Sequence, residues 1–178
     1  ETDKFSREFF STVATLNQVG EIDQATVDKL SSSIADQIKN TVPKKVFTNV
    51  DIKVSNTNTK EAFQKYSDTL DTIYKKYPIK KGVTAILEEF MVDEDVNVLT
   101  QLDSVITQMS KIINETVKIS TPNSLASLHL DFINSLQRLT ENLNDIQLFE
   151  DDVIIAMSAI SQYEKNLDSL DEATNNLL

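Results

Sequence analysis

The chain has 178 residues, with 2 Gly, 3 Pro, no Cys and a formal net charge of -11. Without Cys it has no disulfide, thiolate nucleophile or cysteine-ligated zinc, and so few Gly and Pro residues argue against an all-β fold, which needs many turns. The negative charge argues against general nucleic-acid binding, because phosphate backbones would be repelled.

Two helices are expected at the N-terminal end. The first covers residues 3–19 and ends at Gly20, where a left-handed cap is least strained. The second runs from a capping residue, Asp23, to about Asn40. Its inward face is expected to consist of Val27, Leu30, Ile34 and Ile38.

Pro43 ends the helical pattern, and residues 44–57 are expected to be extended. Val50, Ile52 and Val54 alternate with polar residues there, which is the period of a strand. A lone strand has no hydrogen-bonding partner. We therefore expect this segment to cross the bundle without forming a sheet, unless another chain pairs with it.

A third helix is expected from a cap at Asn58, assisted by Glu61, to Tyr77, where Pro78 stops it. A short helix is expected over residues 83–91.

Three long helices are expected in the C-terminal half. The first follows an acidic turn at residues 93–95, and the last begins near Asp152. The central helix, residues 124–148, has a continuous apolar stripe at spacings of three and four, formed by Leu125, Leu128, Phe132, Leu136, Leu139, Leu143 and Ile146. So long a stripe needs neighbours on more than one side, which makes this the core helix. Residues 171–178 are expected to fray.

Together these patterns predict an all-α fold. We expect a single-domain helical bundle over residues 1–178, with about six to seven helices. Three long C-terminal helices would pack with a smaller N-terminal helical layer and one short extended segment.

His129 is the only histidine and lies beside the apolar stripe. Ser124, Ser127 and Ser135 are not three or four residues away from it, so no serine of the same helix shares its face. A partner from another helix stays open. We interpret His129 as a core or boundary residue rather than a catalytic base.

Asp93, Asp95 and Asn97 occupy the first, third and fifth positions of an EF-hand-like loop. The sixth position is Val98 instead of Gly, and the twelfth is Ser104 instead of Glu. Helix capping explains these acidic residues better than calcium binding. A single histidine also cannot supply the two Glu-x-x-His motifs of a di-iron bundle. We expect no metal, no cofactor and no catalytic residue.

One basic cluster interrupts the acidic sequence. It is a candidate interaction patch composed of Tyr74, Lys75, Lys76, Tyr77, Lys80 and Lys81. One interpretation is a solvated helix end, where cations suit the helix dipole. The other is a docking point for an anionic membrane surface or protein partner.

Three segments resemble one group of proteins: FSREFFSTVATL at residues 5–16, SLHLDFINSLQRL at 127–139 and ISQYEKNLDSL at 160–170. They are similar to an uncharacterised family of extracytoplasmic proteins from small-genome, candidate-phylum bacteria, over most of the chain. The resemblance implies one N-terminal membrane helix, an Asp/Gly-rich linker and then a helical domain. The membrane helix and linker would lie upstream of Glu1.

The leading hypothesis is a non-enzymatic extracytoplasmic helical module, tethered to a membrane upstream of Glu1, that mediates protein–protein interaction or envelope assembly. A protein partner or envelope component is expected, and no nucleic acid. Membrane contact would come only from a segment outside this chain or from weak electrostatic attraction. One alternative is a ligand-binding helical sensor or substrate-capture domain, and a weaker one is a cytoplasmic adaptor.

Overall fold

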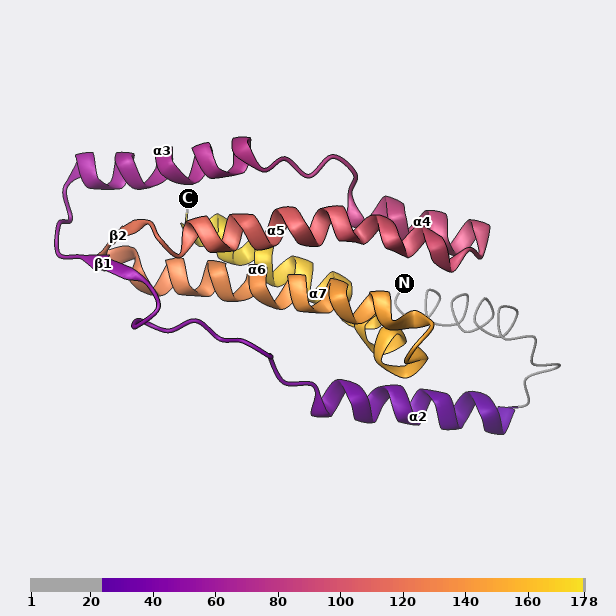
Figure 1. Cartoon of the computed structure of the whole chain (residues 1–178). Coiled ribbons are helices and arrows are strands. Elements are labelled where there is room, and N and C mark those ends of the chain that lie inside the picture. The colour runs from indigo at the N-terminus through magenta and orange to yellow at the C-terminus, as the bar shows by residue number, and fades with distance from the viewer. Residues whose placement is uncertain (1–23, 178) are drawn as a thin grey trace. The chain divides into compact units, whose positions relative to one another are not determined.

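The structure is a computed structural model, and it describes residues 24–177 (Figure 1). The helix predicted for residues 3–19 lies outside the described residues, as do Gly20 and the cap predicted at Asp23.

Helices dominate the described residues. The α-helices there are α2 (Gln24–Asn40), α3 (Lys60–Lys76), α4 (Val83–Asp93), α5 (Leu102–Thr116), α6 (Ala126–Ile146) and α7 (Val153–Leu177). Short 3-10 helices are η1 (Val96–Gln101), η2 (Asn123–Leu125) and η3 (Gln147–Phe149), and the two strands are β1 (Lys53–Ser55) and β2 (Ser120–Pro122). The predicted all-α helical bundle is confirmed. No helix within residues 24–177 has both the length and the apolar character needed to cross a membrane.

Internal contacts divide the chain into two compact units. Within the described residues, the first unit consists of 24–42, 81–103 and 142–163, and the second of 43–80, 104–141 and 164–177. Helices α5, α6 and α7 each contribute residues to both units.

The first unit is centred on α4 and the turn that follows α6. Ile86 and Phe90 of α4 are fully buried. The Phe90 ring meets the edge of the Phe149 ring, with centroids 5.1 Å apart. The side-chain amide of Asn142 donates to the carbonyl oxygen of Ala159 at 2.8 Å, which fixes α6 to α7 in this unit. Apolar packing and this buried hydrogen bond therefore both stabilise the first unit.

The second unit contains a small parallel sheet. Strand β1 pairs with β2, and Val54 lies opposite Thr121. The expectation that residues 44–57 would find no partner within the chain was wrong. The partner, Ser120–Pro122, carries none of the alternating apolar pattern of a strand, and the turn composition of its sequence hides its role.

The third helix is capped differently from the prediction. Thr59 is the N-cap of α3, and its hydroxyl accepts a hydrogen bond from the backbone N–H of Ala62. Asn58 instead accepts from the backbone N–H and the hydroxyl of Ser124, at 3.3 and 3.1 Å. The predicted cap was wrong by one residue because Asn58 connects two distant segments of the chain.

The apolar stripe of α6 is buried as predicted. Its core members are Phe132, Leu136, Leu139, Leu143 and Ile146, whereas Leu125 and Leu128 at the N-terminal end are only partly buried.

Both ends of the described chain depart from the sequence-based expectation. Helix α7 continues to Leu177, and Ala173 and Leu177 are buried, so the fraying predicted for residues 171–178 is not observed up to Leu177. In α2, Ile34 is buried as expected, whereas Ile38 is exposed. The inward placements expected for Val27 and Leu30 fall outside what the structure describes.

Candidate functional site

The residues predicted as an interaction patch are divided between the two units. Tyr74, Lys75, Lys76, Tyr77 and Lys80 belong to the second unit, at the C-terminal end of α3 and just after it, and we call them the α3-end cluster. Lys81 belongs to the first unit.

Exposed apolar groups accompany the cations of the α3-end cluster. Tyr74 is 40% exposed, and Ile79, which immediately precedes Lys80, is 45% exposed. The other side of the Tyr74 ring packs against Phe132, with centroids 6.3 Å apart. Removal of water there raises the pKa of Tyr74 to about 12. Tyr74 therefore contacts Phe132 while part of its side chain is exposed to solvent.

The cations of the α3-end cluster have different surroundings. Lys75 pairs with Asp71, one turn earlier on α3. The ammonium of Lys76 lies 5.0 Å from the centre of the Tyr77 ring. A hydrogen bond with Tyr77, followed by the charge of Glu115, raises the pKa of Lys76.

Lys81 is engaged inside the first unit. Its ammonium donates to the carboxylate of Glu89 and to the amide oxygen of Gln101, the latter at 2.7 Å. The amide of Gln101 also donates to Glu89 at 3.3 Å. The hydrogen bond from Lys81 lowers the pKa of Glu89. Lys81 thus joins the start of α4 to η1.

His129 is a core residue and has a partner that sequence reasoning missed. It is fully buried, and its Nδ1 lies 2.7 Å from the hydroxyl oxygen of Tyr66 on α3; which atom donates depends on the tautomer. The other ring nitrogen, Nε2, is buried without a hydrogen-bond partner. Burial lowers the pKa of His129 to about 4, so the ring is neutral near pH 7. Such a ring cannot reach a substrate at the surface.

Of the acidic residues 93–95, Asp95 caps a helix with its side chain. Asp95 is the N-cap of η1, and its carboxylate accepts from the backbone N–H and the side-chain amide of Asn97, at 2.9 and 2.7 Å. Within residues 24–177, no group of three or more His, Asp or Glu side chains is placed to hold a metal ion.

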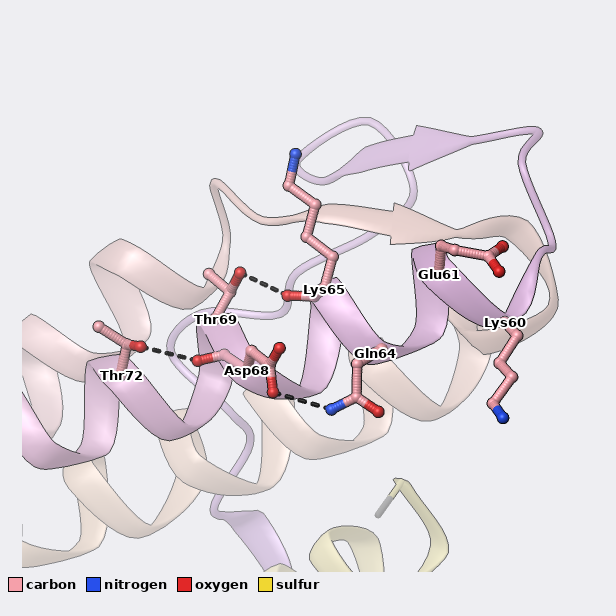
Figure 2. A pocket seen from close by; sticks show the side chains of 7 residues that line it. All are labelled: Lys60, Glu61, Gln64, Lys65, Asp68, Thr69 and Thr72. Atoms are coloured by element: carbon pink, nitrogen blue, oxygen red, sulfur yellow. Dashed lines mark hydrogen bonds between the residues drawn. The ribbon is translucent and has the colours of Figure 1, made fainter.

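One hollow of about 650 Å³ lies along the polar face of α3. Figure 2 shows its lining: Lys60, Glu61, Gln64, Lys65, Asp68, Thr69 and Thr72. The hydroxyls of Thr69 and Thr72 donate to backbone carbonyls one turn earlier, at 2.6 and 2.7 Å. The amide of Gln64 donates to Asp68 at 2.9 Å. These groups are satisfied by their own helix, as expected for a solvated surface.

A second hollow, which we call the α6–α7 groove, lies between two helices of the second unit and has a volume of about 480 Å³. Its lining residues are Asp131, Asn134, Ser135 and Arg138 of α6, and Asn166, Ser169, Glu172, Ala173 and Asn176 of α7. All but Ala173 have polar side chains. The side-chain nitrogen of Asn166 is buried and has no hydrogen-bond partner. An unpaired buried donor is costly, so it marks this groove as the better candidate for a ligand.

The α6–α7 groove was not predicted, although every polar residue in it was visible in the sequence. The single signal was that Asp131, Asn134, Ser135 and Arg138 share one face of a helix by their spacing. That face becomes half of a groove only because α7 lies beside it.

Comparisons of the chain with models of protein families, with curated proteins and with solved structures found no match.

Proposed function

We propose that this chain is a non-enzymatic extracytoplasmic helical module that binds a partner protein or envelope component through the α3-end cluster. The proposal includes a membrane tether upstream of Glu1, which the family resemblance implies. The observation that carries the binding proposal is the exposure of Tyr74 and Ile79 next to the cations of the cluster.

This combination suits a docking surface in physical terms. Interfaces tend to have aromatic and aliphatic anchors at their centre and charged groups around them. Tyr74 is held by Phe132, so little side-chain entropy is lost when a partner covers it. The chain carries a net charge of -11, so a local group of lysines would favour an acidic partner and orient its approach.

The surroundings of His129 support the non-enzymatic part of the proposal. A general base has to reach a proton on the substrate, and its pKa works best near the working pH. His129 is fully buried against Tyr66, and burial lowers its pKa to about 4.

The α6–α7 groove favours a second candidate function, capture of a small ligand by a helical domain. The two functions are compatible, because the groove and the α3-end cluster share no residue.

Location is tested by adding protease to intact cells that produce the full-length protein. We expect the helical domain to be cleaved while a cytoplasmic protein in the same cells stays intact. Cleavage only after lysis would support the cytoplasmic adaptor and would refute the proposed location.

Binding is tested with a photo-crosslinking amino acid placed at Ile79. We expect one acidic partner to crosslink, and we expect Lys75→Glu, Lys76→Glu and Lys80→Glu together to abolish that product at moderate salt. The matched control reverses Lys60 and Lys65, which are exposed on the same helix. Equal loss in both variants, or a product that survives reversal of the cluster, would contradict docking at the α3-end cluster.

A further inference from the structure

The α6–α7 groove has opposite charges at its two ends. Helices α6 and α7 are joined by a short connection and run in opposite directions (Figure 1). Arg138 and Asn166 are the lining residues nearest to that connection along each helix, so they lie at the same end of the groove. Asp131 and Glu172 lie farther from the connection, at the other end. One end therefore offers hydrogen-bond donors and a positive charge, and the other offers two carboxylates.

The donor end contains two polar groups without a partner in the described chain. Within the described part of the chain, Arg138 forms neither a hydrogen bond nor an ion pair. The side-chain nitrogen of Asn166 is buried without a partner. A guanidinium binds a carboxylate through two parallel hydrogen bonds, and an amide N–H can supply a third.

The middle of the groove is polar, and some of its side chains already form hydrogen bonds within the chain. The side-chain oxygen of Asn134 accepts a hydrogen bond from the backbone N–H of Phe47 at 2.7 Å. The side-chain nitrogen of Asn134 donates to the carbonyl oxygen of Phe47 at 3.0 Å, so Asn134 positions a loop. The hydroxyl of Ser169 donates to the carbonyl oxygen of Lys165 at 2.9 Å, which leaves its oxygen free to accept. Ser169 can therefore accept a hydrogen bond from a peptide N–H, and Ser135 of α6 also lines the groove.

The length of the groove sets the size of the ligand. Asp131 and Arg138 are seven residues apart on one face of α6, which corresponds to about 10 Å along the helix. An extended peptide advances by about 3.3 to 3.6 Å per residue, so three residues span that distance.

We propose that the α6–α7 groove binds a short peptide with free termini, of about three residues. Its carboxylate pairs with Arg138 and Asn166, and its ammonium group lies between Asp131 and Glu172. Recognition rests on the two termini, so the side chains of the peptide contribute little. This site rests on the second candidate function, capture of a small ligand, and names its ligand; its test needs no partner protein, so it can fail while binding at the α3-end cluster stands.

The test uses trialanine as the probe and records the side-chain amide resonances of the intact chain by NMR. We expect trialanine to shift the Asn166 resonance in a saturable manner at millimolar concentration or below. The same peptide with an acetylated N-terminus and an amidated C-terminus should not bind. Free alanine should bind at least about ten-fold more weakly, because it cannot reach both ends of the groove.

Variants separate recognition from folding. Arg138→Gln and Glu172→Gln should each weaken trialanine binding by about ten-fold or more. The matched control is Lys165→Gln, an exposed change on α7 one residue before Asn166. It should leave trialanine binding unchanged. Each variant should keep the wild-type circular dichroism spectrum. Equal binding of the capped peptide, unchanged binding by Arg138→Gln, or no shift of Asn166 at any concentration up to about ten millimolar would overturn the proposal.

Discussion

The hydroxyl oxygen of Tyr66 on α3 lies 2.7 Å from Nδ1 of His129 on α6, and both side chains are buried. Their rings meet edge to face, with centroids 5.7 Å apart. This contact links α3 to the core helix of the second unit. Its buried histidine has one unpaired nitrogen, so protonation would place a charge in a site that cannot solvate it.

This contact predicts a pH dependence of folding. Burial lowers the pKa of His129 from 6.5 to about 4 in the folded chain, so the unfolded chain takes up the proton first as the pH falls. Stability is therefore full above about pH 6.5 and declines as the pH approaches 4, by roughly 2 kcal/mol between pH 7 and pH 5. Urea denaturation at these two pH values measures the loss.

The control for this prediction is His129→Gln, which cannot titrate. We expect its stability to change little between pH 7 and pH 5, because most carboxylates remain ionised in that range. If wild type and variant lost the same free energy, groups other than His129 would be responsible.

A second prediction concerns the contribution of a buried carboxylate to stability. Glu141 is 6% exposed and accepts from the backbone N–H groups of Lys44 and Lys45, at 3.0 and 2.9 Å. Glu141→Gln places an amide donor against one of these N–H donors, so we expect a loss of roughly 2 kcal/mol in the free energy of unfolding. Hydrogen exchange at Lys44 and Lys45 should become faster. Glu164→Gln, an exposed change on α7, should change neither the free energy of unfolding nor the rate of hydrogen exchange at Lys44 and Lys45.

A third prediction concerns the contribution of the core helix to stability. Leu136 is 3% exposed in the middle of the α6 stripe. Leu136→Ala should leave a cavity and cost roughly 2 to 5 kcal/mol in chemical denaturation. Val50→Ala is the matched control, because Val50 is 92% exposed and should change stability by less than about 0.5 kcal/mol. A loss below about 1 kcal/mol for Leu136→Ala would mean that α6 is not the core helix.

The sequence predicted the features that depend on local periodicity. The α6 stripe from Phe132 to Ile146 is buried because spacings of three and four place these side chains on one face of a helix. The end of α2 at Asn40, shortly before Pro43, follows from local backbone chemistry.

Features that depend on a distant segment were missed. Val54 pairs with Thr121, which nothing near either residue indicates. Likewise Asn58 bonds Ser124 and leaves the capping position to Thr59. The polar residues of α6 could not be assigned to a groove either, because the other half of its lining comes from α7, which is distant in the sequence.

The last prediction concerns Glu94, which has a left-handed backbone conformation with φ of 53°. It ends α4, and its N–H donates to the carbonyl oxygen of Phe90 at 3.0 Å. A side chain in this conformation costs roughly 1 to 2 kcal/mol, whereas glycine adopts it freely. Glycine also increases the entropy of the unfolded chain, which offsets part of that gain. We therefore expect Glu94→Gly to raise the free energy of unfolding by about 0.5 to 1 kcal/mol, measured by urea denaturation.

Two further variants at Glu94 separate the backbone from the charge. A negative charge at the C-terminal end of a helix opposes the helix dipole, so Glu94→Gln should gain a few tenths of a kcal/mol at most at this exposed position. Glu94→Ala loses the same charge but keeps a Cβ atom in the left-handed conformation, so it should resemble Glu94→Gln rather than Glu94→Gly. If all three variants gained equally, the stabilisation would come from removing charge near Asp93 and Asp95, and the backbone conformation of Glu94 would contribute nothing measurable.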